Sequence, residues 1–266
     1  MKTNKLREKL SHDEPTLSTH ILSTWPPGIE AIGHTGLYDY VEFVAEYGAF
    51  DLHDLDNICR TAELYDMSSM IKVDQSHQEF LAQRGIGAGF SSVLFTDCRS
   101  AEDVRQCVRI SRADTPEDNG LFGAATRRNS YMGYGGTPDY VESVNNTVLA
   151  VMIEKKGAVD ELDEILDIDG VDMIQWGGTD YSMSVGLVGQ SKHPDVIAVR
   201  NKVFKSALDK GVVPRAEVGT PDDAKEFLDM GVRHFSIGTD LSVLYDWWNS
   251  NGEGIWKTMS DAGVGR

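Results

Sequence analysis

Eight short apolar runs alternate with amphipathic stretches along almost the whole chain of 266 residues. Each run reads as a β-strand, and each is followed by a helix or a helix-like segment. This alternation is typical of a parallel sheet whose strands are joined by crossover helices. Eight such units in about 250 residues predict a closed (β/α)8 TIM barrel of the α/β class. The expected strands are residues 16–24, 40–46, 69–74, 91–97, 146–154, 171–176, 212–218 and 234–238.

We expect residues 1–266 to form one barrel domain with a short N-terminal extension. The alternative is a doubly wound open sheet, but no G-x-G-x-x-G motif follows the first strand, and no G-x-x-x-x-G-K-[ST] loop occurs. The sequence therefore favours the barrel. The expected helices are a segment beginning near residue 51, then 78–84, 100–111, 158–166, 195–210, 221–230 and most of 244–259.

The charge balance excludes several classes of partner. With 25 Lys+Arg against 42 Asp+Glu, the formal net charge is −17 and the isoelectric point is near 4.7. Nucleic acids and anionic membranes would be repelled by such a protein. No apolar run approaches the roughly 20 residues of a membrane span, and the first residues lack the apolar core of a secretory signal, so a cytoplasmic protein is expected. Three cysteines without a C-x-x-C pair indicate buried thiols rather than disulfides or structural zinc.

Charged side chains collect where the expected strands end. In a (β/α)8 barrel these ends surround the active-site mouth. Carboxylates gathered there would repel one another unless a cation lay among them, and oxygen ligands of this kind suit Mg²⁺ or Mn²⁺. No pair of histidines has the spacing of a zinc site. The charged residues at strand ends are Glu46, Lys72, Asp74, Asp97, Glu154, Lys155, Asp180, Arg215, Glu217 and Asp240.

Two segments make the predicted cation site more specific. The strand VMI ends abruptly in the acid Glu154, and the strand ending in Trp176 leads into a Gly-Gly turn followed by Thr179 and Asp180. Glycines let backbone N–H groups approach a ligand carboxylate closely, while Asp180 faces the cation.

The stretch MIEKKGAVDELDEILDIDGVDMIQWGGTDYSMSVGLVGQSKHPDV, residues 152–196, resembles the core of the HpcH/HpaI-type class II pyruvate aldolases. The family pattern is an acid after a strand, a helix–strand unit ending in GvD, and a G-x-x-D-L-S turn. The resemblance extends from about residue 38 to residue 244. It implies a (β/α)8 barrel of the phosphoenolpyruvate/pyruvate-binding type, a divalent metal, and a homo-oligomer, a trimer or hexamer.

The resemblance also implies an activity, the reversible aldol cleavage of a 2-keto-4-hydroxy acid to pyruvate and an aldehyde. Glu154 matches the metal-binding glutamate of the family, and Asp180 its metal-binding aspartate. The backbone at Gly178 and Thr179 matches the turn that holds the pyruvyl carboxylate. Mg²⁺ or Mn²⁺, with Co²⁺ as a further candidate, would chelate the keto acid and stabilise the enolate that forms as the C3–C4 bond breaks.

The acid–base residues depart from the family pattern. A D-G-E-H run, whose histidine is the base, is replaced here by Val44-Ala45-Glu46-Tyr47. The arginine expected after the next strand is Lys72, which keeps the charge but loses the bidentate fork. The candidate catalytic residues are therefore Glu46 first, then Tyr47 if its phenol pKa were lowered beside Lys72.

The catalytic base and the role of Lys72 each have a further candidate. A metal-bound water is a further candidate base, whereas His20 and His53 are interpreted as packed or surface histidines. Lys72 is also positioned to form a Schiff base, as in class I aldolases, but the metal pair argues against a second electron sink.

Distal substrate binding is assigned to Arg128, with its neighbour Arg127, in the long Gly-rich loop of residues 114–136, and to Arg215. Rim salt bridges are the alternative for each arginine. The Trp247-Trp248 pair indicates an apolar contact surface for a neighbouring subunit.

Three other functions compete with the aldolase. An oxaloacetate-type decarboxylase would need the metal but little proton-abstraction machinery, which suits the missing histidine. A CoA-ester lyase would need an extended basic surface that the sequence does not show. A protein that binds keto acids without catalysis would have kept the metal and lost the base.

Overall fold

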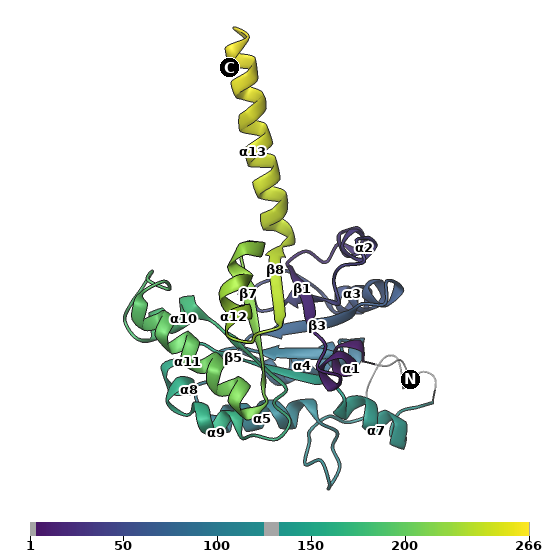
Figure 1. The fold of residues 1–266 in the computed structure, drawn as a ribbon. Helices are drawn as coiled ribbons and strands as arrows, with labels where there is room; N and C mark the ends of the chain where they lie inside the picture. Colours follow the sequence, from purple (N-terminus) through teal and green to yellow (C-terminus); the bar gives the residue numbers. More distant parts are fainter. Residues whose placement is uncertain (1–3, 125–132, 266) are drawn as a thin grey trace.

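The computed structural model describes residues 4–124 and 133–265. In these residues eight parallel strands pair in chain order and close into one barrel, β8 pairing with β1 (Figure 1). The predicted (β/α)8 architecture is confirmed, and each expected strand is present with bounds shifted by a few residues. The strands are β1 Thr16–Ile21, β2 Tyr40–Val44, β3 Ser68–Val73, β4 Ser92–Phe95, β5 Val148–Ile153, β6 Met173–Trp176, β7 Val213–Val218 and β8 His234–Thr239.

Most of the helices lie on the outer face of the barrel (Figure 1). The expected helices are present, although the segment 158–166 is two short helices and 221–230 begins as a 3-10 turn. The helices are α1 Lys5–Ser11, α2 Pro26–His34, α3 Leu52–Leu64, α4 Gln78–Ala88, α5 Ala101–Ser111, α7 Pro138–Asn145, α8 Lys156–Asp160, α9 Leu162–Leu166, α10 Gly178–Ser184, α11 Pro194–Lys210, η1 Pro221–Asp223, α12 Ala224–Asp229 and α13 Asp240–Asp261.

Four helices lie where the sequence analysis expected none: α1, α2, α7 and α10. The Pro26-Pro27 pair begins α2, because proline fits the first turn of a helix. In α7, Pro138 occupies the first turn and Thr137 caps the helix by accepting a hydrogen bond from the Tyr140 N–H. Both helices are short, and short helices carry weak periodicity in sequence.

The N-terminal extension closes the bottom of the barrel. Leu6 of α1 is 1% exposed and packs with the apolar residues inside the barrel, among them Met70 and Met173. Arg7 pairs with Asp172, its Nη2 lying 2.7 Å from Oδ2. The Asn4 side chain donates hydrogen bonds to two carbonyl oxygens in the loops before β4 and β5. The extension is therefore part of the packed barrel.

The upper interior of the barrel holds a buried ion pair. Glu42 of β2 and Arg215 of β7 are 0% and 1% exposed, and Arg215 Nη1 contacts a carboxylate oxygen of Glu42. The guanidinium also donates to the side chains of Ser18, at 2.9 Å, and Gln175. Burial of an unpaired charge is strongly unfavourable, so each partner makes the burial of the other tolerable.

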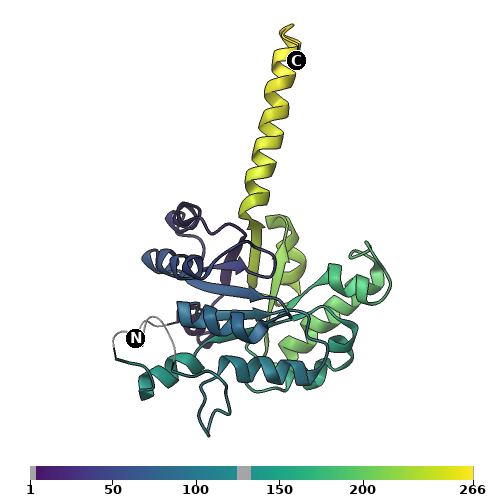
Figure 2. The ribbon, with the colours of Figure 1, turned by 180° about the vertical axis from the view of Figure 1, so that it is seen from behind.

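The last helix does not return to the barrel. β8 ends at Thr239 and α13 begins at Asp240, so no loop lies between them to turn the chain back. Figures 1 and 2 show α13 standing away from the barrel beyond the end of β8. None of residues 240–261, all of which the structure describes, is buried. No helix within residues 4–124 and 133–265 is both long and apolar enough to cross a bilayer.

We predict that Arg215→Met lowers the free energy of unfolding by about 3–5 kcal/mol, because it leaves the Glu42 carboxylate buried without its main partner. The double variant Glu42→Leu/Arg215→Met should recover most of this loss. Urea unfolding followed by circular dichroism measures both. The control is Arg105→Met, which removes half-exposed pairs with Glu102 and Glu164 and should cost about 1 kcal/mol or less. Equal losses in the two single variants would contradict the prediction.

Candidate active site

Glu154 directly follows β5 at the carboxyl end of the barrel. It is 4% exposed, and its Oε1 accepts a hydrogen bond from the backbone N–H of Asp97 at 2.8 Å. On the other side, Gly177 lies against it: a Cβ at position 177 would be 2.5 Å from the Glu154 Cβ and closer still to Oε2. The glycine after β6 therefore makes room for the carboxylate.

The predicted Gly-Gly turn continues directly into α10. Gly178, Thr179 and Asp180 form the first turn of this helix, so their positions are fixed by helical geometry rather than by a loop. Tyr181, the next residue, stacks at a tilt against Trp176 with 4.8 Å between ring centroids. The residues of this segment were predicted from the sequence, but the helix was not.

Lys155 connects the carboxylates of this region. Its Nζ donates to Asp180 Oδ1 at 2.8 Å and lies 2.6 Å from Asp97 Oδ1. Lys155 and Asp97 were expected only to be charged residues at strand ends, with no assigned role. Lys155 follows Glu154 in the chain and Asp97 lies just after β4. These two positions were the signal in the sequence that both side chains lie at the mouth. Glu154, Asp97, Asp180 and Lys155 thus form one cluster, which we call the carboxylate half of the mouth.

The surroundings of Glu154 disfavour its charged form. Burial raises the pKa of Glu154 to about 7, and the carboxylates of Asp180 and Asp97 add to the rise. The Asp97 N–H and the charge of Lys72 act in the opposite direction. A bound cation would remove this penalty, because it compensates the buried negative charge.

The residues present fit a hard divalent cation. Within the described ranges 4–124 and 133–265, no three His, Cys, Asp or Glu side chains converge on one metal position. If a divalent metal is bound, the carboxylates of Glu154 and Asp180 are the groups that would hold it, with water and substrate oxygens completing the coordination. Mg²⁺ is bound in this way in many enzymes.

The other half of the mouth carries an ion pair between Lys72, in β3, and Glu46. Lys72 Nζ lies 2.7 Å from Glu46 Oε2. Burial alone would lower the pKa of Lys72, but Glu42 and Glu46 outweigh it and hold the pKa above its usual value. Lys72 is therefore an ammonium at neutral pH. An amine nucleophile must be unprotonated, so this charge state opposes the Schiff-base alternative.

Tyr47 follows Glu46 and is 68% exposed. Its ring lies 5.6 Å from Lys72 Nζ. Partial burial nevertheless raises the pKa of the phenol, and the lowering effect of Lys72 does not offset it. The condition under which Tyr47 would act as a base, a lowered pKa, is therefore not met, and the phenol remains a hydrogen-bond donor.

The expectation that Arg215 binds the distal end of the substrate needs correction. Its guanidinium lies inside the barrel below the mouth, paired with Glu42, because residue 215 points inward in β7. Arg127 and Arg128 fall outside the described residues. His53 lies in the first turn of α3 with an exposed side chain.

His20 points into the barrel from β1. Its Nε2 lies 3.3 Å from Glu217 Oε1 and 3.4 Å from Glu42 Oε1. His20 was expected to be a packed or surface histidine, with no connection to Glu217. The alternation of β1, which places His20 on the same face as Ser18, was the signal that it points inward.

A closed barrel with buried and half-buried carboxylates at the carboxyl ends of its strands is the arrangement of a (β/α)8-barrel enzyme. Residues 45–246 match the HpcH/HpaI aldolase/citrate lyase family. The chain belongs to this family, as the residues 152–196 predicted.

Relatives of known name agree with this placement. The chain is 26% identical to a hydroxypyruvate/pyruvate aldolase of Paraburkholderia phytofirmans over 90% of its own length and 92% of the relative. It is also 26% identical to a 2-keto-3-deoxy-L-rhamnonate aldolase of Escherichia coli, over 92% and 90%. The structure of a family protein from Burkholderia cenocepacia superposes with a TM-score of 0.82 at 25% identity, covering 95% of this chain and 99% of the other. These relatives support a carbon–carbon lyase.

We predict that Gly177→Ala weakens Mn²⁺ or Mg²⁺ binding at least about tenfold, because the added Cβ displaces the Glu154 carboxylate. Isothermal titration calorimetry measures the affinity. Gly252→Ala is the matched control, since a Cβ there meets nothing within 4 Å. Unchanged metal affinity in Gly177→Ala would show that Glu154 does not need this close approach.

Proposed function

We propose that this protein is a divalent-metal-dependent aldolase, which cleaves or forms the C3–C4 bond of a 2-keto-4-hydroxy acid and yields pyruvate and an aldehyde. The observation that carries the proposal is the buried Glu154 carboxylate beside Asp180 and the Gly177-Gly178 turn, in a member of the HpcH/HpaI family. The hydroxypyruvate/pyruvate and keto-deoxy-rhamnonate aldolases among its relatives support the reaction class.

Glu154 and Asp180 would hold Mg²⁺ or Mn²⁺, which supplies Lewis-acid polarisation of the 2-keto group when bound. The backbone at Gly178 and Thr179 would receive the substrate carboxylate. Lys72 adds a fixed positive charge close enough to lower the pKa of Glu154. The same ammonium would stabilise the negative charge that develops on the 2-keto oxygen as the C3–C4 bond breaks. Glu46 holds this ammonium in place.

One observation favours a second candidate, an oxaloacetate-type decarboxylase on the same site. Val44 and Tyr47 occupy the positions of the family's acid–base pair, and the Tyr47 phenol stays protonated. Decarboxylation releases CO₂ without removing a proton from a hydroxyl group, so it needs less acid–base machinery.

The test of the proposed function is the exchange of pyruvate C3 protons for deuterium, followed by proton NMR with Mg²⁺ and with EDTA. We expect Mg²⁺-dependent exchange that falls by at least about 100-fold in Glu154→Gln and in Asp180→Asn. Asp160→Asn, which removes an exposed pair with Lys156, is the control and should exchange at the wild-type rate.

Three outcomes would contradict the aldolase. Consumption of oxaloacetate without exchange would establish the decarboxylase. Binding of pyruvate with neither activity would indicate a protein that binds keto acids without catalysis. Exchange that persists in EDTA and disappears in Lys72→Met would point to the Schiff base.

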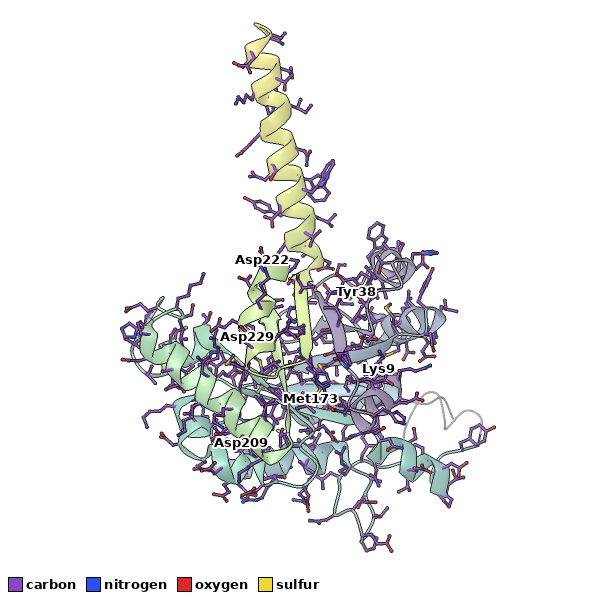
Figure 3. The ribbon with its side chains drawn as sticks, in the orientation of Figure 1. Lys9, Tyr38, Met173, Asp209, Asp222 and Asp229 are labelled. Carbon is purple, nitrogen blue, oxygen red and sulfur yellow. The ribbon has the colours of Figure 1, made fainter. Side chains whose placement is uncertain are left out.

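We further infer a homo-oligomer assembled through α13. Figure 3 shows the side chains of this helix projecting around it, away from the barrel. Its apolar residues include Trp247 and Trp248, which are 63% and 62% exposed. Asp240 fixes the direction of the helix, since its carboxylate accepts hydrogen bonds from the N–H groups of Leu22 and Ser23. An exposed apolar helix held rigidly in this way suits packing against a second copy of the chain.

We predict that Trp247→Glu/Trp248→Glu converts the oligomer to the 29.4 kDa monomer in size-exclusion chromatography with light scattering. Buried charges at a subunit contact oppose association. Leu64→Glu changes an exposed leucine at the end of α3 and should leave the mass unchanged. A wild-type protein that is already monomeric would contradict the inference.

A further inference from the structure

A histidine–carboxylate pair lies at the mouth of the barrel, apart from the carboxylate half. His20 is near the end of β1 and Glu217 near the end of β7, and the His20 Nε2 lies 3.3 Å from Glu217 Oε1. The two strands are brought together by β8, which pairs with both. Neither residue has a role in the site described so far.

The pair is held from several sides. Glu42 Oε1 lies 3.4 Å from the His20 Nε2, and Glu42 is itself fixed by Arg215. Ser236 Oγ of β8 lies 3.2 Å from the same nitrogen. From β6, the Gln175 side chain donates a hydrogen bond to Glu217 Oε1. Such a network fixes the position of both partners, unlike an ion pair between two surface side chains.

The side chains of His20 and Glu217 differ in their exposure to solvent. The His20 side chain is 14% exposed and that of Glu217 is 45% exposed. Glu217 is therefore the member that solvent or a substrate can reach, and the imidazole lies behind it. This is the arrangement of an orienting group and a proton-transfer group.

The surroundings of His20 favour its charged form. Burial lowers the pKa of His20, but the carboxylates of Glu42 and Glu217 outweigh burial and the opposing charge of Arg215, so the pKa is raised. The charged groups that face His20 are thus Glu42 from β2 and both Glu217 and Arg215 from β7. Lys72 of β3 acts on the same Glu42. The positive charge of a protonated imidazole attracts the carboxylates of both Glu42 and Glu217, which lie 3.4 and 3.3 Å from its Nε2.

The other candidate acid–base groups of the mouth are an ion-paired carboxylate and a protonated phenol. Glu46 is paired with Lys72 at 2.7 Å, and the Tyr47 phenol holds its proton. The Glu217 carboxylate is within electrostatic reach of that phenol, so it belongs to the same part of the mouth.

We propose that the Glu217–His20 pair handles the proton of the aldol reaction, with Glu217 as the group that meets the substrate and His20 as its positioning residue. The proposal rests on the aldolase function proposed above. In cleavage, Glu217 accepts the proton of the C4 hydroxyl group, the O–H electron pair forms the aldehyde C=O, and the C3–C4 electron pair passes to the pyruvate fragment. The same proton is then returned to C3, so no proton is gained or lost overall.

The test is the rate of pyruvate C3 exchange against pH in Glu217→Gln and His20→Gln, with Mg²⁺ affinity measured by calorimetry on the same samples. We expect Glu217→Gln to lower the rate at least about 100-fold while Mg²⁺ affinity stays within about twofold. His20→Gln should lower it about tenfold. The wild-type rate should decline as pH rises through the pKa of His20, and His20→Gln should lack this decline.

The controls are Glu226→Gln and His53→Gln, which change an exposed glutamate and an exposed histidine on outer helices. Glu217→Asp keeps a carboxylate, so it should restore part of the rate that Glu217→Gln loses. Wild-type rates and pH profiles in the Glu217 and His20 variants would overturn this inference and leave the aldolase intact. A wild-type protein that binds Mg²⁺ but exchanges no pyruvate protons would overturn the proposed function first.

Discussion

The ion pair between Glu42 and Arg215 is the interaction on which the inside of this barrel depends. Both groups are almost fully buried, and neither would be tolerated there alone. Arg215 also binds Ser18 and Gln175, and Glu42 faces His20. The pair thus ties β1, β2, β6 and β7 together beneath the mouth. The side chains at the mouth therefore lie above a layer of buried charged groups, not above an apolar layer.

The mouth has two halves with different chemistry. Glu154, Asp97 and Asp180 gather negative charge at the ends of β4, β5 and β6, with Lys155 among them. The ends of β1, β2, β3 and β7 carry histidine, lysine and paired carboxylates. Lys72 acts on both halves, since its charge lowers the pKa of Glu154 while Glu42 and Glu46 hold it protonated. A keto acid bound at the carboxylate half would therefore lie beside a fixed positive charge.

The acid–base residues at the end of β2 differ from those that the resemblance implies. The run Val44-Ala45-Glu46-Tyr47 contains no histidine, while β2 and its pairing with β3 are complete. In this chain an imidazole enters the mouth from β1, one strand away. A barrel permits such relocation because all eight strand ends face the same mouth. Proton transfer can thus be supplied from another strand without altering the fold.

The sequence by itself determined the eight strands, the helices with strong periodicity, and the order of Glu154, the Gly-Gly turn and Asp180 along the chain. These are local properties, since alternation, capping and glycine placement act over a few residues. Only the tertiary structure decided that Arg215 is buried, that His20 meets Glu217, and that Lys155 joins Asp97 to Asp180. Such contacts depend on the register and closure of the barrel, which bring together residues far apart in sequence. The direction of α13 was equally beyond the sequence pattern, because a helix that continues from a strand without a loop carries the same periodicity as one that returns to the barrel.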